Sequence, residues 1–122
     1  MLKDDLFTFN ELQEEGNMVT TNIKLNPSHP IFKGHFPDQS VLPGVCMMQM
    51  VKEVLEVCIK KQTMLTKASD IKFLSVVAPE QDKLIQIELK ISAVDDGIRV
   101  DARLLDDAAI LFKFKGIFKE IA

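Results

Sequence analysis

Residues 45–59 read VCMMQMVKEVLEVCI, and their apolar positions recur at the spacing of an α-helix. One broad arc of the helical wheel is apolar, so we expect it to pack on a core. That arc holds Met47, Met48, Val51, Val54, Leu55, Cys58 and Ile59. The opposite arc is expected to face solvent. It holds Gln49, Lys52, Glu53, Glu56 and Lys60. Because Pro43 suits a first helical turn, the sequence predicts a helix over residues 44–62, the longest element of the chain.

Strand patterns lie on both sides of this helix. Before it, residues 6–13 and 18–25 alternate around the turn signal Glu15-Gly16-Asn17, which predicts a β-hairpin. After it, alternation and turn residues predict four more strands. These cover residues 71–77, 85–91, 98–104 and 110–118, with turns at 79–82, 95–97 and 106–107. The sequence therefore predicts an α+β fold: one long helix against an antiparallel sheet of about six strands, in a single domain over residues 1–122.

Composition restricts the classes of function. The chain has 122 residues, of which 47% are hydrophobic, and this suits one globular domain. No run approaches the roughly 18 apolar residues of a membrane span. The first residues, Met1–Asp5, lack the apolar core of a signal peptide, so we expect a cytoplasmic protein. A net charge of −3 argues against a nucleic-acid partner.

The cysteines and histidines do not form a recognisable metal or disulfide pattern. Cys46 and Cys58 lie on the same predicted helix, about 18 Å apart by helical rise, which is too far for a disulfide. With two histidines and no Cys-x-x-Cys pair, we expect no metal site. These features favour a reducing compartment.

A proline-rich segment, residues 26–43, leads into the helix. Long structureless loops in compact domains are usually functional. This one carries His35, and histidine is well matched to proton transfer near neutral pH. Free N–H groups at Gly44 and Val45 could bind a carbonyl oxygen that gains negative charge. This combination suits removal of a proton α to a thioester. The same spacing also fits a packed loop histidine before an ordinary helix start, and His29 is expected to be a surface histidine.

The segment Phe32-Lys33-Gly34-His35-Phe36-Pro37, followed after five residues by Pro43-Gly44-Val45, resembles a known family. It is similar to the hot-dog-fold 3-hydroxyacyl-acyl-carrier-protein dehydratases of fatty-acid synthesis, over about residues 16–119. The resemblance implies a long central helix wrapped by a curved antiparallel sheet. It also implies a dimer whose sheets join edge to edge, with each active site drawing on both subunits. His35 would be the catalytic histidine, and Phe36, Gly44 and Val45 would bind the substrate thioester.

Gln49 departs from the family pattern. The family has an acid on the helix, six residues after the proline of Pro-Gly, and here that position is Gln49. A carboxyl group can pass a proton to a departing hydroxyl, whereas an amide can only hydrogen-bond. Dehydration through His35 alone should be slower, because acid–base assistance typically contributes about 10²–10⁴-fold. Glu53, one turn further on, is a weaker substitute, and Gln49 could equally belong to the solvated arc.

These observations leave three functions open. The first is a dehydratase-like enzyme acting on 3-hydroxyacyl thioesters of acyl carrier protein or CoA, in fatty-acid or related acyl-chain biosynthesis, without a cofactor. The second is a hot-dog thioesterase, in which Gln49 or a carboxylate positions the attacking water. The third is a non-catalytic subunit that binds acyl carrier protein or pairs with an active homologue. The assembly would be a homodimer, a trimer of dimers or a heterodimer. The charged arc predicts a short acyl group or a shallow pocket.

Overall fold

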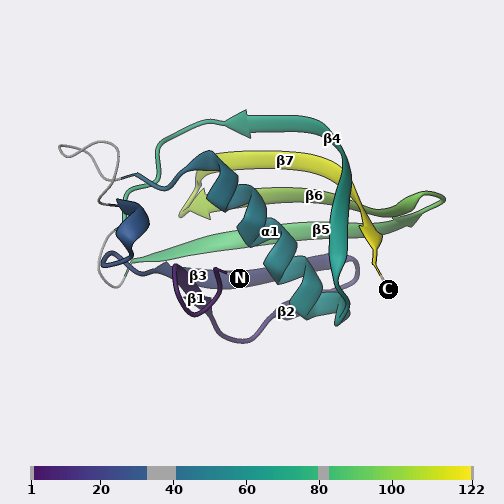
Figure 1. Cartoon of the computed structure of the whole chain (residues 1–122), viewed down its shortest axis with the longest axis horizontal. Coiled ribbons are helices and arrows are strands. Elements are labelled where there is room, and N and C mark those ends of the chain that lie inside the picture. Colours follow the sequence, from purple (N-terminus) through teal and green to yellow (C-terminus); the bar gives the residue numbers. More distant parts are fainter. Residues whose placement is uncertain (1, 33–40, 80–82, 122) are drawn as a thin grey trace.

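The computed structural model describes residues 2–32, 41–79 and 83–121, and places one long helix across one face of a seven-stranded sheet (Figure 1). The elements are β1 Phe7–Phe9, β2 Gln13–Glu15, β3 Met18–Leu25, the short 3-10 helix η1 Pro30–Phe32, α1 Gly44–Ile59, β4 Thr63–Phe73, β5 Leu84–Val94, β6 Gly97–Asp106 and β7 Ala109–Glu120. Within the described ranges, no helix is both long and apolar enough to cross a membrane.

The sheet is antiparallel throughout, with the strand order β1-β3-β5-β6-β7-β4 and with β2 also paired to β3. The chain leaves β3, passes through α1 and returns as β4 at the opposite edge, beside β7. The predicted class, one long helix against an antiparallel sheet, is confirmed. The predicted turns at residues 95–97 and 106–107 are confirmed as the β5–β6 and β6–β7 connections.

The core lies between α1 and the inner face of the sheet. The helix buries Met47, Met50, Val51, Val54 and Leu55. The central strands contribute inward residues at every second position, as half-buried strands do. These are Ile85, Ile87, Leu89, Val100, Ala102, Leu104, Phe112, Phe114 and Phe118. Most of the predicted apolar arc is therefore confirmed as buried, while Met48, Cys58 and Ile59 are only partly buried and the buried Met50 was not assigned to the arc.

The helix ends earlier, and the next strand starts earlier, than predicted. Lys60 adopts a left-handed conformation (φ 59°) that ends α1 at Ile59 rather than at residue 62. Strand β4 then begins at Thr63, not at Ile71. The alternation is hidden because β4 is an edge strand with mostly exposed residues and two register shifts against β7. The first predicted strand, residues 6–13, is also divided into β1 and β2, which both pair with β3.

Glu53 does not belong to a solvated arc, contrary to the prediction. Its side chain is fully buried. Its two carboxylate oxygens accept hydrogen bonds from the backbone N–H groups of Leu2 (3.0 Å) and Lys3 (2.8 Å). The N-terminal segment therefore covers this side of the helix, and Leu6 and Phe7 are themselves fully buried. A carboxylate is tolerated at this depth because donors satisfy it.

Replacing Glu53 by alanine should destabilise the fold markedly, because two backbone N–H groups would lose their buried acceptors. We expect the free energy of unfolding to fall by about 2–4 kcal/mol, measured by urea denaturation. Glu53→Gln retains one acceptor and should lose less. Lys52→Ala, one residue away on α1, serves as the control and should change stability by under about 1 kcal/mol. Equal stability of Glu53→Ala and the native chain would contradict this assignment.

Candidate active site

The N-terminus of α1 presents two backbone donors that have no acceptor among the described residues. Pro43 precedes the helix in an extended conformation, and its carbonyl accepts the N–H groups of Cys46 (3.0 Å) and Met47 (3.4 Å). No side chain caps this end, and the N–H groups of Gly44 and Val45 have no acceptor among the described residues. The positive end of the helix dipole lies behind them. These donors can therefore hold an oxygen that carries partial negative charge.

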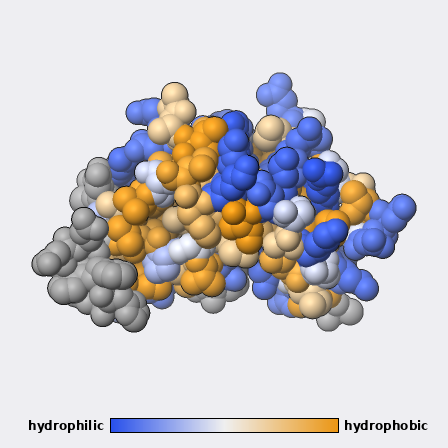
Figure 2. Space-filling model, turned by 90° about the horizontal axis from the view of Figure 1, so that it is seen from above, coloured by the Kyte–Doolittle hydropathy of each residue, from blue (hydrophilic) through white to orange (hydrophobic). Residues whose placement is uncertain are grey.

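An aromatic ring lies directly against Gly44. A Cβ atom added at Gly44 would lie 2.6 Å from Cζ of Phe73, so only glycine leaves room for this ring. The ring of Phe73 stacks on that of Phe112, with 5.2 Å between centroids. Phe73 is nevertheless 54% exposed, and Val45 is 72% exposed. In Figure 2, hydrophobic surface is concentrated on the half of the visible face of the protein where α1 begins. The donors therefore open beside an apolar wall.

Gln49 lies one helical turn beyond Val45 on the same side of α1. Its side chain is partly buried, and its amide has no hydrogen-bond partner within the described residues. Its neighbour one turn further on is the buried Glu53, whose carboxylate is occupied by Leu2 and Lys3. Glu53 is therefore unavailable as a substitute acid. The first two turns of α1 thus bring together Gly44, Val45 and Gln49.

Two predicted site residues, His35 and Phe36, lie outside the described residues. The described chain resumes at Val41, immediately before the helix. Leu42 is buried, and its N–H donates to the carbonyl oxygen of Val77 at 2.7 Å. Residues 74–77, which were predicted to continue a strand, lie beyond the end of β4. The N–H groups of Leu74 and Ser75 donate to Leu111, and Val77 contacts the segment before the helix through Leu42. Phe73 was also missed, since the sequence gives no signal of its contact with Gly44.

His29 is a structural residue rather than a surface or catalytic one. Its Nδ1 accepts the N–H of Ile31 at 3.1 Å, and its Nε2 lies 3.2 Å from Oδ2 of Asp5. The side chain is only 14% exposed, so the expected surface position is wrong. With both ring nitrogens engaged, His29 joins the segment before the helix to the N-terminal residues and has no nitrogen left for substrate.

Neither cysteine is an activated thiol. Cys46 is buried, and burial raises its pKa. Burial also raises the pKa of Cys58, and a hydrogen bond from its Sγ to Oε1 of Glu14 (3.0 Å) adds to the effect, giving about 11. The thiolate is the nucleophilic and metal-binding form. Among the described residues, no group of three or more His, Cys, Asp or Glu could hold a metal ion.

Alkylation should reveal the protected state of Cys58. A folded-state pKa of about 11, against an ordinary 9.0, leaves about fifty times less thiolate at pH 9 than in the unfolded chain. We expect a matching difference in the rate of iodoacetamide addition, followed by mass spectrometry with and without urea. Because the folded-state pKa is raised, this thiol also opposes folding as the pH rises above 9. Glu14→Gln should accelerate alkylation, and equal rates in folded and unfolded protein would refute the assignment.

Comparison with known proteins identifies the family. The family model of ApeI-like proteins, described as ApeI dehydratase, matches residues 11–105. The chain belongs to the ApeI-like dehydratase family. The ApeI-like chain is 30% identical over 83 residues to the 3-hydroxyacyl-(acyl-carrier-protein) dehydratase FabZ of Macrococcus caseolyticus, covering 62% of this chain and 57% of that protein. It is 29% identical over 113 residues to FabZ of Petrotoga mobilis, and the match covers 88% of this chain and 69% of that protein. The match to FabZ of Histophilus somni spans only 28% of that enzyme.

Solved structures confirm the hot-dog fold of the ApeI-like chain. A chain of the dehydratase heterocomplex ApeI:P from Xenorhabdus doucetiae matches with a TM-score of 0.73 and 17% identity, covering 91% of this chain and 96% of that one. The (R)-hydratase from A. caviae involved in PHA biosynthesis matches with a TM-score of 0.62 and 11% sequence identity. This match covers 88% of this chain and 96% of the hydratase chain. A thioesterase superfamily protein from Shewanella loihica matches with a TM-score of 0.59 and 9% sequence identity. This match covers 92% of this chain and 90% of that one. At these identities the likeness establishes the fold alone.

Proposed function

We propose that this chain dehydrates 3-hydroxyacyl thioesters, carried on acyl carrier protein or CoA, in fatty-acid or related acyl-chain biosynthesis. The observation that carries the proposal is the pair of N–H groups at Gly44 and Val45, which have no acceptor in the part of the chain that the structure describes. Gln49 lies one turn away, and the chain is a member of a dehydratase family. These donors suit the thioester carbonyl oxygen, which gains negative charge when a proton leaves the adjacent carbon.

The proposed chemistry requires one proton to be removed and one to be delivered. His35 takes the proton from the carbon next to the carbonyl, while Gly44 and Val45 hold the carbonyl oxygen. The bond between the next carbon and its hydroxyl group then breaks, a carbon–carbon double bond forms, and His35 returns the proton to the departing hydroxyl. Water and a 2-enoyl thioester are the products. Gln49 orients the hydroxyl group through its amide.

The proposed substrate carries a short acyl group. A longer chain extending along α1 beyond Gln49 would meet Glu53, which is fully buried under the N-terminal segment. Displacing that segment would leave an unpaired carboxylate against an apolar chain, which is costly. The face of α1 beyond Gln49 is therefore filled by the protein itself.

The function can be tested in the reverse direction, by hydration of a short 2-enoyl thioester. Loss of the conjugated absorbance would report hydration, and a thiol reagent in a parallel sample would report hydrolysis. We expect the absorbance to fall in a His35-dependent manner without release of thiol. Thiol release that depends on His35 would show that the chain is a thioesterase and not a dehydratase. If neither the absorbance nor the thiol signal changed, the chain would not be an enzyme for this substrate.

We also propose that the functional unit is a dimer joined through the β4 edge. Among the described residues β4 pairs with β7 alone, so alternate residues along its other edge present backbone groups without a strand partner. Apolar side chains beside the end of this strand are exposed: Phe73 at 54%, Leu74 at 52% and Val76 at 73%. Phe73 lies against Gly44, so a second subunit at this edge would reach the start of α1 and complete the site. The partner is a second copy, alone or within a trimer of dimers, or a homologue.

Charges placed at this edge should disrupt the dimer. We expect the native chain to sediment as a dimer at about 50 μM and Leu74→Lys/Val76→Lys to sediment as a monomer, because the lysines would be buried unpaired. Leu84→Lys is the control, since Leu84 is also 54% exposed but begins β5. A native chain that sediments as a monomer, or a double variant that stays dimeric, would exclude this edge from self-association.

Gln49 also supports a second candidate function, a non-catalytic subunit that pairs with an active homologue. The amide cannot supply the proton that the family's acid supplies. This candidate predicts that the isolated chain binds a 2-enoyl thioester without converting it, and that activity appears only when a homologue with the acid is added.

A further inference from the structure

A row of neighbouring residues on α1 leads from the candidate active site to the N-terminal segment. Its members are four positions apart, and residues at this spacing are neighbours on a helix surface: Val45, Gln49, Glu53 and Val57. Val45 is 72% exposed, and Gln49 is partly buried. Glu53 is fully buried, and Val57, one turn further on, is again 37% exposed. The row is therefore covered at Glu53 and reaches the surface on both sides of it.

The cover at Glu53 is the N-terminal segment of residues 2–6, which we call the strap. The N–H groups of Leu2 and Lys3 donate to the two carboxylate oxygens of Glu53 at 3.0 Å and 2.8 Å. The strap also closes on itself, because the carbonyl oxygen of Leu2 accepts the N–H of Leu6 at 2.8 Å. Leu6 is fully buried, and Leu2 is partly buried against the core. The strap is therefore a compact cap that is held to α1 through the carboxylate of Glu53.

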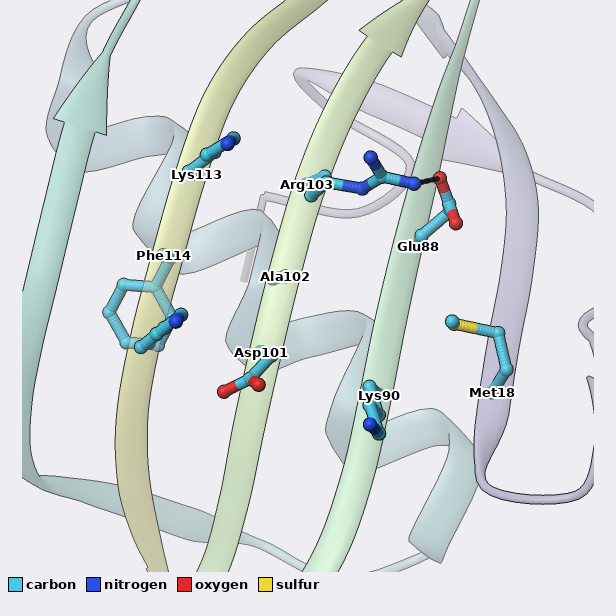
Figure 3. Close-up of a pocket in the computed structure, with 9 residues that line it drawn as sticks. Met18, Glu88, Lys90, Asp101, Ala102, Arg103, Lys113 and Phe114 are labelled. Atoms are coloured by element: carbon cyan, nitrogen blue, oxygen red, sulfur yellow. Dashed lines mark hydrogen bonds and ion pairs between the residues drawn. The ribbon is translucent and has the colours of Figure 1, made fainter.

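The proposed chemistry sets the direction of the acyl group. It holds the thioester carbonyl at Gly44 and the hydroxyl group on the third carbon beside Gln49, so the remaining carbons continue along the row toward Glu53. A hollow of about 240 Å³ lies over β5, β6 and β7 on the opposite face of the sheet (Figure 3). In that view α1 lies behind the strands. The sheet separates this hollow from the start of α1, so the hollow cannot receive the acyl group.

The distance from the donors to the strap corresponds to a definite chain length. Gly44 and Glu53 are nine positions apart in α1, which is about 13.5 Å of helical rise. An extended chain advances roughly 1.2 Å per bond, so about ten carbons reach from the carbonyl to the strap. A longer acyl group would have to displace the strap. That displacement would leave the carboxylate of Glu53 without its donors beside an apolar chain, which is costly.

We propose that the strap, held by Glu53, sets the upper length of the acyl group at about ten carbons. The inference rests on the proposed function, because it starts from a thioester held at Gly44. Glu53 is a specificity-determining residue in this account: it does not touch the reacting atoms, and it keeps the strap in the path of the chain. Without its carboxylate, Leu2 and Lys3 are released from α1, and longer acyl groups can pass toward the exposed Val57.

The test is a series of straight-chain 2-enoyl-CoA thioesters of about 4 to 14 carbons, assayed for hydration by the native chain and by Glu53→Ala. For the native chain we expect kcat/KM to fall at least about tenfold beyond about ten carbons. In Glu53→Ala, the ratio of kcat/KM for about 12 carbons to that for about 4 carbons should rise at least about tenfold. Loss of folded protein does not alter this ratio, because both substrates are measured on the same sample.

Glu56→Ala is the matched control. Glu56 also holds a backbone N–H with its carboxylate, that of Thr63, but at the other end of α1. Its loss should reduce stability and change the ratio by less than about twofold. Glu53→Gln retains one acceptor for the strap, so it should raise the ratio in the same direction by a smaller factor. This milder variant decides the question if Glu53→Ala does not fold.

An unchanged length profile in the folded Glu53 variants would overturn the proposal, as would equal turnover of the longest and shortest thioesters by the native chain. Failure of the proposed function gives a different result, namely no hydration by the native chain at any length. Binding of saturated acyl-CoA of the same lengths, measured by titration calorimetry, then decides. A preference for short chains that Glu53→Ala relaxes would support the strap as the length limit. Absence of binding, or a preference that Glu53→Ala leaves unchanged, would overturn it.

Discussion

His35→Ala should lower the rate of dehydration by about 10²–10⁴-fold, because the proposed reaction uses this imidazole both to remove and to return a proton. The loss should fall on kcat, with little change in KM, since the donors at Gly44 and Val45 remain to bind the thioester. Steady-state kinetics on a short 3-hydroxyacyl thioester would measure both quantities.

His29→Ala is the matched control for this experiment. Both nitrogens of His29 are engaged by Asp5 and Ile31, so its loss should reduce stability and leave the turnover of folded protein unchanged. Retention of more than about a tenth of the activity by His35→Ala, or an equal loss in His29→Ala, would contradict the assigned role of His35.

Gln49→Glu should have the opposite effect and raise the dehydration rate, by at least about tenfold and up to the 10²–10⁴-fold that acid–base assistance can supply. The position is partly buried on the same side of α1 as Val45, so a carboxyl group there would lie beside the proposed substrate oxygen. Gln49→Ala should lower the rate only a few-fold, because it removes one neutral hydrogen bond.

Lys52→Glu separates the position of the new carboxyl group from its charge. It adds a carboxylate three residues further along α1, where we expect no gain in rate. If Gln49→Glu also gave no gain, Gln49 would not occupy the acid position, and the non-catalytic subunit would become the better account. The comparison of these two variants should be made at several pH values, since a protonated carboxyl is the active form.

Local sequence patterns predicted most of the fold. The helix over residues 44–62 is observed as Gly44–Ile59, and the Asp95-Asp96-Gly97 turn joins β5 to β6 as expected. The start of β4 could not be predicted, because an exposed edge strand with two register shifts has neither a buried face nor regular alternation. The burial of Glu53 was also inaccessible, since a helical wheel contains no information about which distant segment covers each side.

The candidate site was predicted unevenly for the same reason. Gly44 and Val45 follow from the helix start, whereas Gln49 was singled out by the family resemblance, and all three lie on the first two turns of α1. Phe73 is 29 positions away in sequence and reaches Gly44 only through the return of β4 to the sheet edge. The roles of His35 and Phe36 stay predictions, because they rest on the family motif and lie outside the described residues.

The most direct test of the proposed function is the intact mass of a short 3-hydroxyacyl carrier protein after incubation with the native chain. We expect loss of one water from the acyl group, and no loss when His35→Ala replaces the native chain. Loss of the entire acyl group, or a substrate whose mass is unchanged at high protein concentration, would contradict it.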